Sequence, residues 1–254
     1  MLKILISGCN GHMGRVVTDL CREAEDVEIA AGFDLLGREP EDFPVYSSPA
    51  AFKGKAHVLI DFSAPAALSA LLNFGMERRI PLVLATTGYS SEQLDQISAA
   101  AQSIPLFRSG NMSLGVNVLA GLVRKAAAAL GNSFDVEIVE RHHRRKVDAP
   151  SGTALLLADA AAEALPYEPE YVYERQSLRQ PRGKREIGIS SVRGGNIVGD
   201  HEVIFAGRDE VIELKHSAMS REVFASGALR AARFLATVET PGLYSMTDLV
   251  DEII

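Results

Sequence analysis

The sequence predicts an α/β protein in which a doubly wound parallel-sheet domain is joined to a second α+β domain with a mixed or antiparallel sheet. Three observations predict this fold. Strand-like apolar runs alternate with helical patterns in the first part of the chain, and a glycine-rich turn joins the first strand to the first helix. Residues 186–192 and 201–215 alternate apolar and polar side chains. We expect residues 1–112 and 221–254 to form the first domain and residues 113–220 the second.

The first domain opens with the pattern of a dinucleotide-binding unit. An apolar strand is predicted at residues 2–6, a helix from Arg15, and a second strand at residues 27–33 that ends at Asp34. Between the first strand and the helix lie Gly8, Cys9, Asn10, Gly11, His12, Met13 and Gly14. Such glycines let the backbone approach a pyrophosphate at the helix N-terminus, and the acid binds ribose hydroxyls, as in a Rossmann-like fold.

The spacing G-x-x-G-x-x-G departs from the common fingerprint, because Asn10 stands where a second glycine is usual. A glycine turn without a ligand is therefore the alternative. Asp34 favours NADH over NADPH, since a carboxylate repels a 2′-phosphate and Leu35-Leu36 adds no guanidinium. Arg38 keeps NADPH open.

The alternation continues with strands expected at residues 57–62 and 81–85 and helices at residues 65–75 and 91–103. Small polar residues follow both strands, where a doubly wound sheet places ligands, so they are candidates to line the nicotinamide ribose. These are Asp61-Phe62-Ser63 and Thr86-Thr87-Gly88, for which ordinary turn chemistry is the alternative. The stretch Ser109-Gly110-Asn111-Met112-Ser113 is expected to cross between the domains.

The second domain carries the densest polar cluster. After a helix at residues 116–130 and a strand at residues 135–139, a loop is expected with the sequence Glu140-Arg141-His142-His143-Arg144-Arg145-Lys146-Val147-Asp148. Two imidazoles that titrate near neutrality beside a lysine indicate acid chemistry next to an anion. For Arg141, Arg144 and Arg145 we expect an ordinary solvated basic face.

An apolar helix then opens at Ala149-Pro150-Ser151-Gly152-Thr153. Free backbone N–H groups beside two hydroxyls make a seat for a carboxylate or phosphate, and a plain helix cap is the alternative. Beyond it, residues 171–184 are expected to form a mobile surface loop, and residues 186–192 and 201–215 an antiparallel sheet with turns at residues 194–196 and 207–209.

Composition excludes several classes of protein. A net charge of −7 and a basic loop without Phe, Tyr or Trp argue against nucleic acid. Adjacent histidines without a nearby cysteine make a poor zinc site, so no metal is expected. Only two cysteines, Cys9 and Cys21, and no leader-like segment favour a reducing cytoplasm, and apolar stretches interrupted by Asp61, Arg108 and Asp159 argue against a membrane span.

The cluster closely resembles the diagnostic segment of the 4-hydroxy-tetrahydrodipicolinate (dihydrodipicolinate) reductase family of lysine and diaminopimelate biosynthesis. The resemblance extends over essentially the whole chain. Its motifs are Glu140-x-His142-His143-x-x-Lys146-x-Asp148-Ala149-Pro150-Ser151-Gly152-Thr153-Ala154, Gly8-x-x-Gly11-x-Met13-Gly14-Arg15, Asp61-Phe62-Ser63, Thr86-Thr87-Gly88, Asn111-Met112-Ser113-x-Gly115-Val116-Asn117 and Arg193-Gly194-Gly195-x-Ile197-Val198-Gly199-x-His201.

The resemblance implies hydride transfer from a nicotinamide to C4 of a ring with two carboxylates, with loss of water. Asp34 makes NADH the preferred cofactor, with NADPH as the alternative. It implies that His142 is the general acid and that Lys146 both assists catalysis and binds substrate, with His143, Ser151, Gly152 and Thr153 also holding the dicarboxylate. The implied cofactor-binding residues are Gly8, Asn10, Gly11, His12, Met13, Gly14, Asp34, Phe62, Ser63, Thr86, Thr87, Gly88, Ser109, Asn111 and Met112, the last by packing. A homotetramer through the second domain's sheet is implied by the same analogy.

Two other functions remain as alternatives: another dehydrogenase, acting on a semialdehyde or sugar, and a non-enzymatic NAD sensor that kept the fold. The middle segment discriminates among them. A different dehydrogenase needs no series of two histidines, a lysine and an anion seat, and a sensor needs no acid. The sequence therefore favours a nicotinamide-dependent reductase of a small dicarboxylate.

Overall fold

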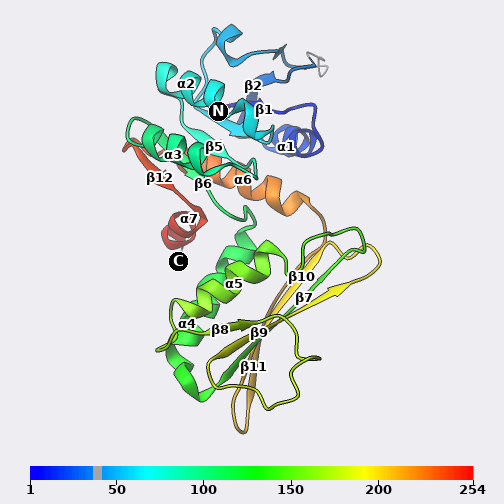
Figure 1. Ribbon diagram of the computed structural model, residues 1–254. Coiled ribbons are helices and arrows are strands. Elements are labelled where there is room, and N and C mark those ends of the chain that lie inside the picture. The colour runs from blue at the N-terminus through cyan, green and yellow to red at the C-terminus, as the bar shows by residue number, and fades with distance from the viewer. Residues whose placement is uncertain (37–41, 254) are drawn as a thin grey trace. The chain divides into compact units, whose positions relative to one another are not determined.

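The structure is a computed structural model that describes residues 1–36 and 42–253 (Figure 1). The chain divides into two compact units. Unit 1 contains Met1–Ser113 and Glu222–Ile254, and unit 2 contains Leu114–Arg221. These boundaries lie one residue beyond the expected positions. Arg38, on which the option of NADPH depended, falls outside the described residues.

Unit 1 is built on a parallel seven-stranded sheet in the order β12-β6-β5-β4-β1-β2-β3. Its strands are β1 (Leu2–Ser7), β2 (Val27–Phe33), β3 (Val45–Tyr46), β4 (Val58–Asp61), β5 (Leu82–Leu84), β6 (Pro105–Arg108) and β12 (Gly242–Tyr244). The order runs outward in both directions from the β1–β4 pair, which confirms the predicted doubly wound sheet.

Helices cover both faces of this sheet. They are α1 (His12–Glu23), α2 (Leu68–Arg78), α3 (Ser91–Ala100), α6 (Glu222–Leu235) and α7 (Met246–Ile253), with short 3₁₀ turns at Pro49–Ala51 and Pro65–Ala67. Helix α1 packs on α6, and α2 packs on α3. The helix expected at residues 65–75 starts as the 3₁₀ turn and continues to Arg78, where the left-handed Arg79 (φ 52°) ends it.

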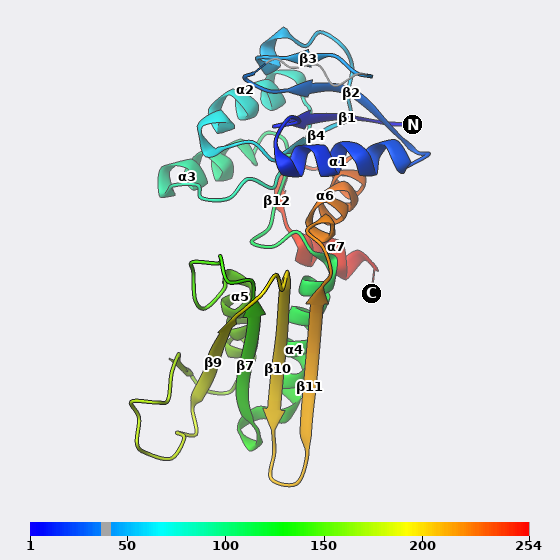
Figure 2. The ribbon, with the colours of Figure 1, turned by 90° about the vertical axis from the view of Figure 1, so that its right-hand side faces the viewer.

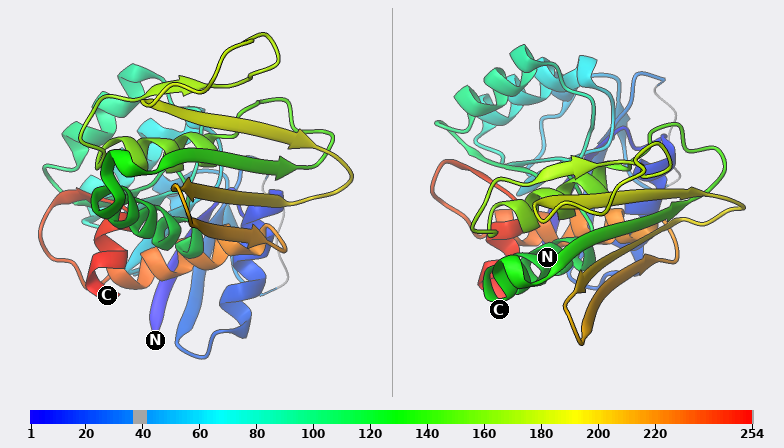
Figure 3. Two further views of the ribbon diagram at one scale, coloured as in Figure 1. Left: turned by 90° about the horizontal axis from the view of Figure 1, so that it is seen from below. Right: turned by 60° about the horizontal axis from the view of Figure 1, so that its bottom comes forward.

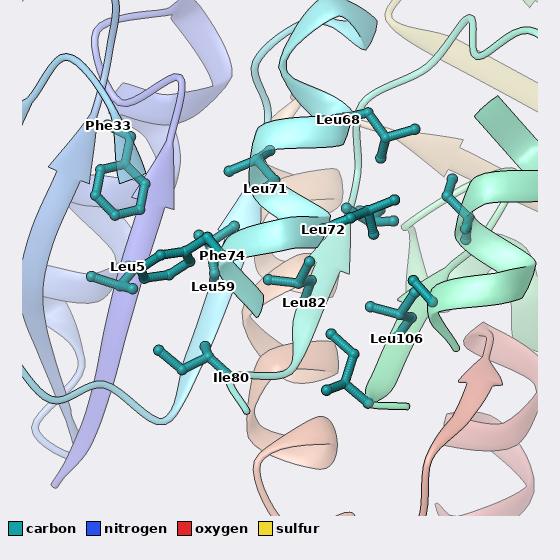
Figure 4. Close-up of a cluster of buried hydrophobic side chains, with 14 of the residues drawn as sticks. Leu5, Phe33, Leu59, Leu68, Leu71, Leu72, Phe74, Ile80, Leu82 and Leu106 are labelled. Carbon is teal, nitrogen blue, oxygen red and sulfur yellow. The ribbon is translucent and has the colours of Figure 1, made fainter. Parts of the chain in front are cut away.

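The core of unit 1 explains why these elements form. Leu5, Leu59 and Leu82, from three neighbouring strands, are completely buried, and they meet the apolar faces of α2 and α3 (Figure 4). Aromatic rings close the cluster, since Phe33 and Phe74 lie edge to face with centroids 5.7 Å apart. Strands buried on both faces read as continuous apolar runs, which is why the sequence located them.

Unit 2 contains a five-stranded sheet in the order β11-β10-β7-β9-β8. Its strands are β7 (Asp135–His142), β8 (Glu170–Val172), β9 (Glu186–Arg193), β10 (Gly199–Ala206) and β11 (Val211–Ala218). The pairs β7–β9 and β8–β9 are parallel, whereas β10 runs antiparallel to β7 and β11 (Figure 2). The sheet is therefore mixed, which is one of the two forms that the sequence predicted, mixed or antiparallel.

The structure corrects two local expectations for unit 2 in part. The antiparallel pairing expected within residues 201–215 is confirmed, since β10 pairs with β11 around the predicted turn at residues 207–209. Strand β9, at residues 186–193, does not pair with β10, because β7 lies between them and alternation of side chains does not specify a strand's partner. The loop expected at residues 171–184 begins inside β8, and Arg182 attaches it firmly to β7. Its guanidinium donates to the carboxylates of Asp135 and Glu137 at 2.8 Å each and to the carbonyl oxygen of Val136 at 2.9 Å.

Helices α4 (Leu114–Leu130) and α5 (Gly152–Ala162) lie side by side on one face of the sheet of unit 2 (Figure 3). By length and composition alone, the segment Leu114–Ser133 would suffice to cross a bilayer, with a mean hydropathy of 1.3. Its buried face, with Leu119, Val123 and Ala127, belongs to the core of unit 2. Arg124, on the same helix, forms an ion pair with Glu163 at 2.9 Å.

Candidate functional site

The glycine turn of unit 1 joins β1 directly to α1, and its glycines are required by close backbone contacts. Gly8 has a positive φ of 75°, a conformation that favours glycine. A Cβ on Gly14 would lie 2.0 Å from the carbonyl oxygen of Gly8, and one on Gly11 would lie 3.1 Å from the same oxygen. The turn therefore folds tightly over the start of α1, whose N-cap is Gly11 and whose first N–H groups are available to an anion.

Asp34 lies immediately after β2, at the same edge of the sheet as this turn. Its carboxylate accepts hydrogen bonds from the backbone N–H groups of Asn10 at 3.2 Å and Leu36 at 3.1 Å. The carboxylate is thus fixed beside the glycine turn by the backbone around it. This is the position expected for an acid that recognises a ribose.

A cavity of about 520 Å³ opens in unit 1 at the carboxyl ends of β4, β5 and β6. Its lining includes predicted cofactor residues from four separate segments of the sequence: His12, Met13, Phe62, Ser63, Thr86, Thr87, Ser109, Asn111 and Met112. Ala85, Gly110 and Phe224 of α6 complete it. Parallel strands bring such segments together because their carboxyl ends meet at one edge of the sheet.

Asp61 organises the polar wall of this cavity, although it is not itself one of the residues that line the cavity. Its completely buried carboxylate accepts the Ser63 hydroxyl hydrogen at 2.5 Å and the Thr86 hydroxyl hydrogen at 2.7 Å. The backbone N–H of Ser63 donates to it as well, at 3.1 Å. The hydroxyls of Ser63 and Thr86 are therefore oriented by Asp61, and the turn chemistry considered as an alternative is present at Ser63.

In unit 2 the predicted polar loop begins later than expected. Strand β7 continues through Glu140, Arg141 and His142, so these three residues belong to the sheet and not to the loop. Alternation along the strand places Glu140 and His142 on its buried face. Arg141 points to the opposite face, where it forms an ion pair with Glu202 at 3.0 Å. Glu140 and His142 are consequently held by the rigid part of the unit.

Glu140 is the most heavily hydrogen-bonded side chain of this cluster. Its Oε2 lies 2.6 Å from Nδ1 of His142, and its two oxygens accept a bidentate pair of hydrogen bonds from Arg193, at 2.7 Å each. Burial alone raises the pKa of Glu140, but the hydrogen bonds from Arg193 and His142 outweigh it and bring the pKa to about 2. The carboxylate is therefore ionised at neutral pH.

The start of α5 is attached to the same carboxylate. The backbone N–H of Ser151 donates to Oε1 of Glu140 at 3.1 Å. The Ser151 hydroxyl caps the helix by accepting from the N–H of Ala154 at 3.2 Å, and it lies 3.0 Å from Nε2 of His201. This hydroxyl is already engaged within the protein, so the exposed backbone of Gly152 and the part-exposed Thr153 form the accessible end of the helix.

Lys146 and His143 lie on the turn that follows β7. The ammonium group of Lys146 forms an ion pair with Asp148 at 2.9 Å, which lowers the pKa of Asp148. Desolvation and the positive charges of Arg145 and Arg221 lower the pKa of His143. Nδ1 of His143 is buried, and the described residues give it no hydrogen-bond partner.

Sequence reasoning missed Arg193 and His201 as members of this site. Each occupies a strand position opposite β7: Arg193 pairs with His142 in the β9 register, and His201 pairs with Glu140 in the β10 register. The signal that was local in the sequence was the Glu-x-His spacing of Glu140 and His142, which places these two side chains on one face of a strand. Among the described residues, no cluster of three His, Cys, Asp or Glu side chains could hold a metal ion.

The chain is similar to known proteins over nearly its whole length. The family model described as "Dihydrodipicolinate reductase, N-terminus" matches residues 2–112, and the model for the C-terminus matches residues 115–250. A 4-hydroxy-tetrahydrodipicolinate reductase of Caldanaerobacter subterraneus subsp. tengcongensis is 53% identical over 250 residues, 98% of each chain. One of Clostridium tetani is 48% identical over 246 residues, 97% of this chain and 96% of its own. The solved structure of a dipicolinate-bound dihydrodipicolinate reductase from Paenisporosarcina sp. TG-14 superposes with a TM-score of 0.81 at 26% identity, covering 96% of this chain and 97% of its own.

Proposed function

Because the chain belongs to the dihydrodipicolinate reductase family, we propose that it reduces 4-hydroxy-tetrahydrodipicolinate to tetrahydrodipicolinate with a nicotinamide dinucleotide and loss of water. The chain is an oxidoreductase by this membership. The observation that carries the proposed chemistry is the 2.6 Å contact between Glu140 and His142 beside the N-terminus of α5. It combines a proton-carrying imidazole with a place for a carboxylate.

The reaction balances with one hydride and one proton. The C4 hydroxyl leaves together with a hydrogen from the neighbouring carbon as water, and the new carbon–carbon double bond is conjugated with the imine of the ring. A bound reduced nicotinamide supplies the hydride that C4 then accepts. The displaced electron pair moves onto the neighbouring carbon, and His142 donates the proton that completes the reduction there. Lys146 offsets the negative charge that develops during this step.

The substrate's two carboxylates would be held by the remaining polar groups of unit 2. We assign the backbone of Gly152 and Thr153, with the Thr153 hydroxyl, to one carboxylate, because they form the accessible end of α5. His143 and Lys146 would face the other. Ser151 would position the helix end instead of binding the carboxylate directly, since its hydroxyl is engaged with Ala154 and His201 and its backbone N–H with Glu140.

Unit 1 would bind the dinucleotide, and its geometry fits one. The close packing of Gly8, Gly11 and Gly14 places the backbone N–H groups of His12 and Met13 at the start of α1, where a pyrophosphate binds best. The adenine ribose would lie by Asp34. The nicotinamide end would occupy the cavity lined by Phe62, Ser63, Thr86, Thr87, Ser109, Asn111 and Met112. Gly88 (φ 83°), also expected at the cofactor, follows Thr87 but is not among the lining residues.

We further propose that NADH is preferred, because the carboxylate of Asp34 is held in place by two backbone N–H groups and would repel a 2′-phosphate. The enzyme would serve lysine and diaminopimelate biosynthesis in the cytoplasm, without a nucleic-acid or membrane partner.

We propose a homotetramer assembled through the sheet of unit 2. Helices α4 and α5 cover one face of this sheet, and the other face carries the exposed apolar side chains of Val192 and Val211. Burying such side chains against a second copy would be favourable. Sedimentation equilibrium should give four times the mass of the chain, and a monomer at micromolar concentration would contradict the assembly.

The function is tested by following nicotinamide absorbance with freshly prepared 4-hydroxy-tetrahydrodipicolinate. The wild-type protein should oxidise NADH only when the dicarboxylate is present. His142→Ala and Lys146→Ala should each lower kcat by about two to four orders of magnitude while nucleotide affinity stays nearly unchanged. Arg124→Ala, which breaks an exposed ion pair on α4, should retain turnover. Unchanged turnover in both active-site variants would contradict the assigned roles.

A further inference from the structure

His142, the proton donor proposed for unit 2, is held by a second and more deeply buried group, Glu140. Glu140 is 0% exposed, and each of its oxygens accepts two hydrogen bonds. Oε2 receives His142 and one nitrogen of Arg193, and Oε1 receives the other nitrogen of Arg193 and the N–H of Ser151. A buried charge of this kind is costly unless such partners surround it.

The ionised carboxylate restricts which nitrogen of His142 carries a proton. A carboxylate can only accept hydrogen bonds, so Nδ1 of His142, 2.6 Å away, must be the protonated nitrogen of the neutral ring. Nε2 is then the nitrogen that exchanges a proton. Gly199 leaves room beside it, since a Cβ at this position would lie 3.0 Å from Nε2.

Arg193 makes this arrangement rigid. Strand β9 runs beside β7 (Figure 2). Their register places Arg193 opposite His142. The guanidinium contacts both oxygens of Glu140 in a fork that a lysine could not reproduce, and it also donates to the backbone carbonyl of Asp148 at 2.6 Å. The carboxylate therefore cannot rotate away from His142 without breaking two charged hydrogen bonds.

The same carboxylate links the proton donor to the helix end. Through Ser151, Glu140 fixes the first turn of α5, and Ser151 in turn contacts His201, whose ring lies edge to face with that of His142 at 5.1 Å. One buried anion thus holds both the imidazole and the backbone that would receive a carboxylate. A residue needed only for packing would not require hydrogen bonds to both.

We propose that Glu140, held by Arg193, is the positioning residue of His142, which it keeps as the Nδ1–H tautomer and in fixed register with the N-terminus of α5. Its catalytic consequence rests on the proposed function, in which His142 donates the proton. Glu140 itself touches no substrate in this proposal. Its effect reaches the reaction only through the orientation and tautomer of the imidazole.

The direct test is the ¹⁵N NMR spectrum of the histidine rings in the full-length protein. His142 is identified by its absence in His142→Asn, in buffer alkaline enough to deprotonate an ordinary imidazole. In the wild type, His142 should give the Nδ1–H tautomer. In Glu140→Gln the amide group cannot accept from all four donors, so the tautomer preference should weaken. A wild-type Nε2–H tautomer, or an unchanged preference in folded Glu140→Gln, would overturn the proposal.

Kinetics provide the second readout. Glu140→Gln should lower kcat about 10- to 100-fold, part of the contribution of a positioned acid, while nucleotide affinity changes less than about twofold. Glu163→Gln, which removes an exposed carboxylate at the end of α5, is the matched control and should keep wild-type kcat. A wild-type protein without reductase activity but with the expected tautomer shift would overturn the proposed function and support the positioning role. An active wild type whose Glu140→Gln variant keeps kcat would support the proposed function and overturn the positioning role.

Discussion

Thr86 donates its hydroxyl hydrogen to Asp61 across the carboxyl ends of two neighbouring strands, with an oxygen–oxygen distance of 2.7 Å. Asp61 ends β4, and Thr86 follows β5, so this bond joins the two strands at the cavity of unit 1. A completely buried carboxylate that orients two hydroxyls in a cavity wall determines which hydrogen-bonding directions remain for a ligand.

Asp61→Asn tests this role. The amide nitrogen cannot accept a hydrogen bond, so at least one hydroxyl or N–H now bonded to Asp61 loses its acceptor. We expect the free energy of unfolding to fall by about 1–3 kcal/mol and NADH affinity to fall roughly 10-fold. Denaturant unfolding and NADH fluorescence titration measure the two effects. Asp95→Asn, on the exposed surface of α3, is the control, and equal results for both variants would contradict the role of Asp61.

Gly14→Ala tests the tightness of the glycine turn. The new Cβ would lie 2.0 Å from the carbonyl oxygen of Gly8 and 2.7 Å from Cα of Cys9, so the backbone must move. We expect a loss of about 1–3 kcal/mol in stability and no measurable NADH binding, by titration and thermal unfolding. Gly121→Ala, inside α4, meets nothing within 4 Å and should instead stabilise the protein by up to about 1 kcal/mol. Similar losses in both variants would refute the steric argument.

Asp34→Ala tests the recognition of the adenine ribose. Without the carboxylate, NADH should bind more weakly and NADPH relatively better, so the ratio of their dissociation constants should shift about 10-fold toward NADPH. Isothermal titration with each coenzyme measures this ratio. Asp42→Ala removes a nearby carboxylate paired with Arg22 and should leave the ratio unchanged. If Asp34→Ala also leaves the ratio of the two dissociation constants unchanged, the explanation of NADH preference is wrong.

The sequence located most of unit 1 because buried parallel strands are apolar runs. The strand at residues 27–33 was predicted to the residue, while β3 and β12, which are short strands at the sheet's edges, carry too few residues for a recognisable pattern. The strand β6 was also missed, and it begins at Pro105.

The candidate site was predictable where it is local in sequence. His142, His143, Lys146 and Ser151 lie in one segment, so their spacing alone identified them. Arg193 and His201 reach Glu140 only through strand pairing, and pairing depends on the order of strands in the sheet, which alternation does not specify. The same limitation led to the incorrect pairing expected for β9 and β10.

The buried His201 makes stability depend on pH. Burial lowers its pKa from 6.5 to about 4, and repulsion from His142 adds to this, while Glu140 and Asp200 oppose it and His216 reinforces it. Between these two values the unfolded chain binds a proton that the folded chain does not, so stability falls as the pH drops through this range. Glu140, with a pKa of about 2 against 4.5, loses its contribution only at lower pH.

We therefore expect the wild-type free energy of unfolding to decrease between pH 7 and pH 5, and His201→Gln to remove roughly 2 kcal/mol of that decrease. Glutamine does not titrate in this range, and its side chain can still hydrogen-bond the Ser151 hydroxyl that lies 3.0 Å from Nε2 of His201. Urea unfolding of both proteins at both pH values gives the required double difference. An equal decrease in the two proteins would mean that His201 accepts a proton in the folded state as readily as in the unfolded chain.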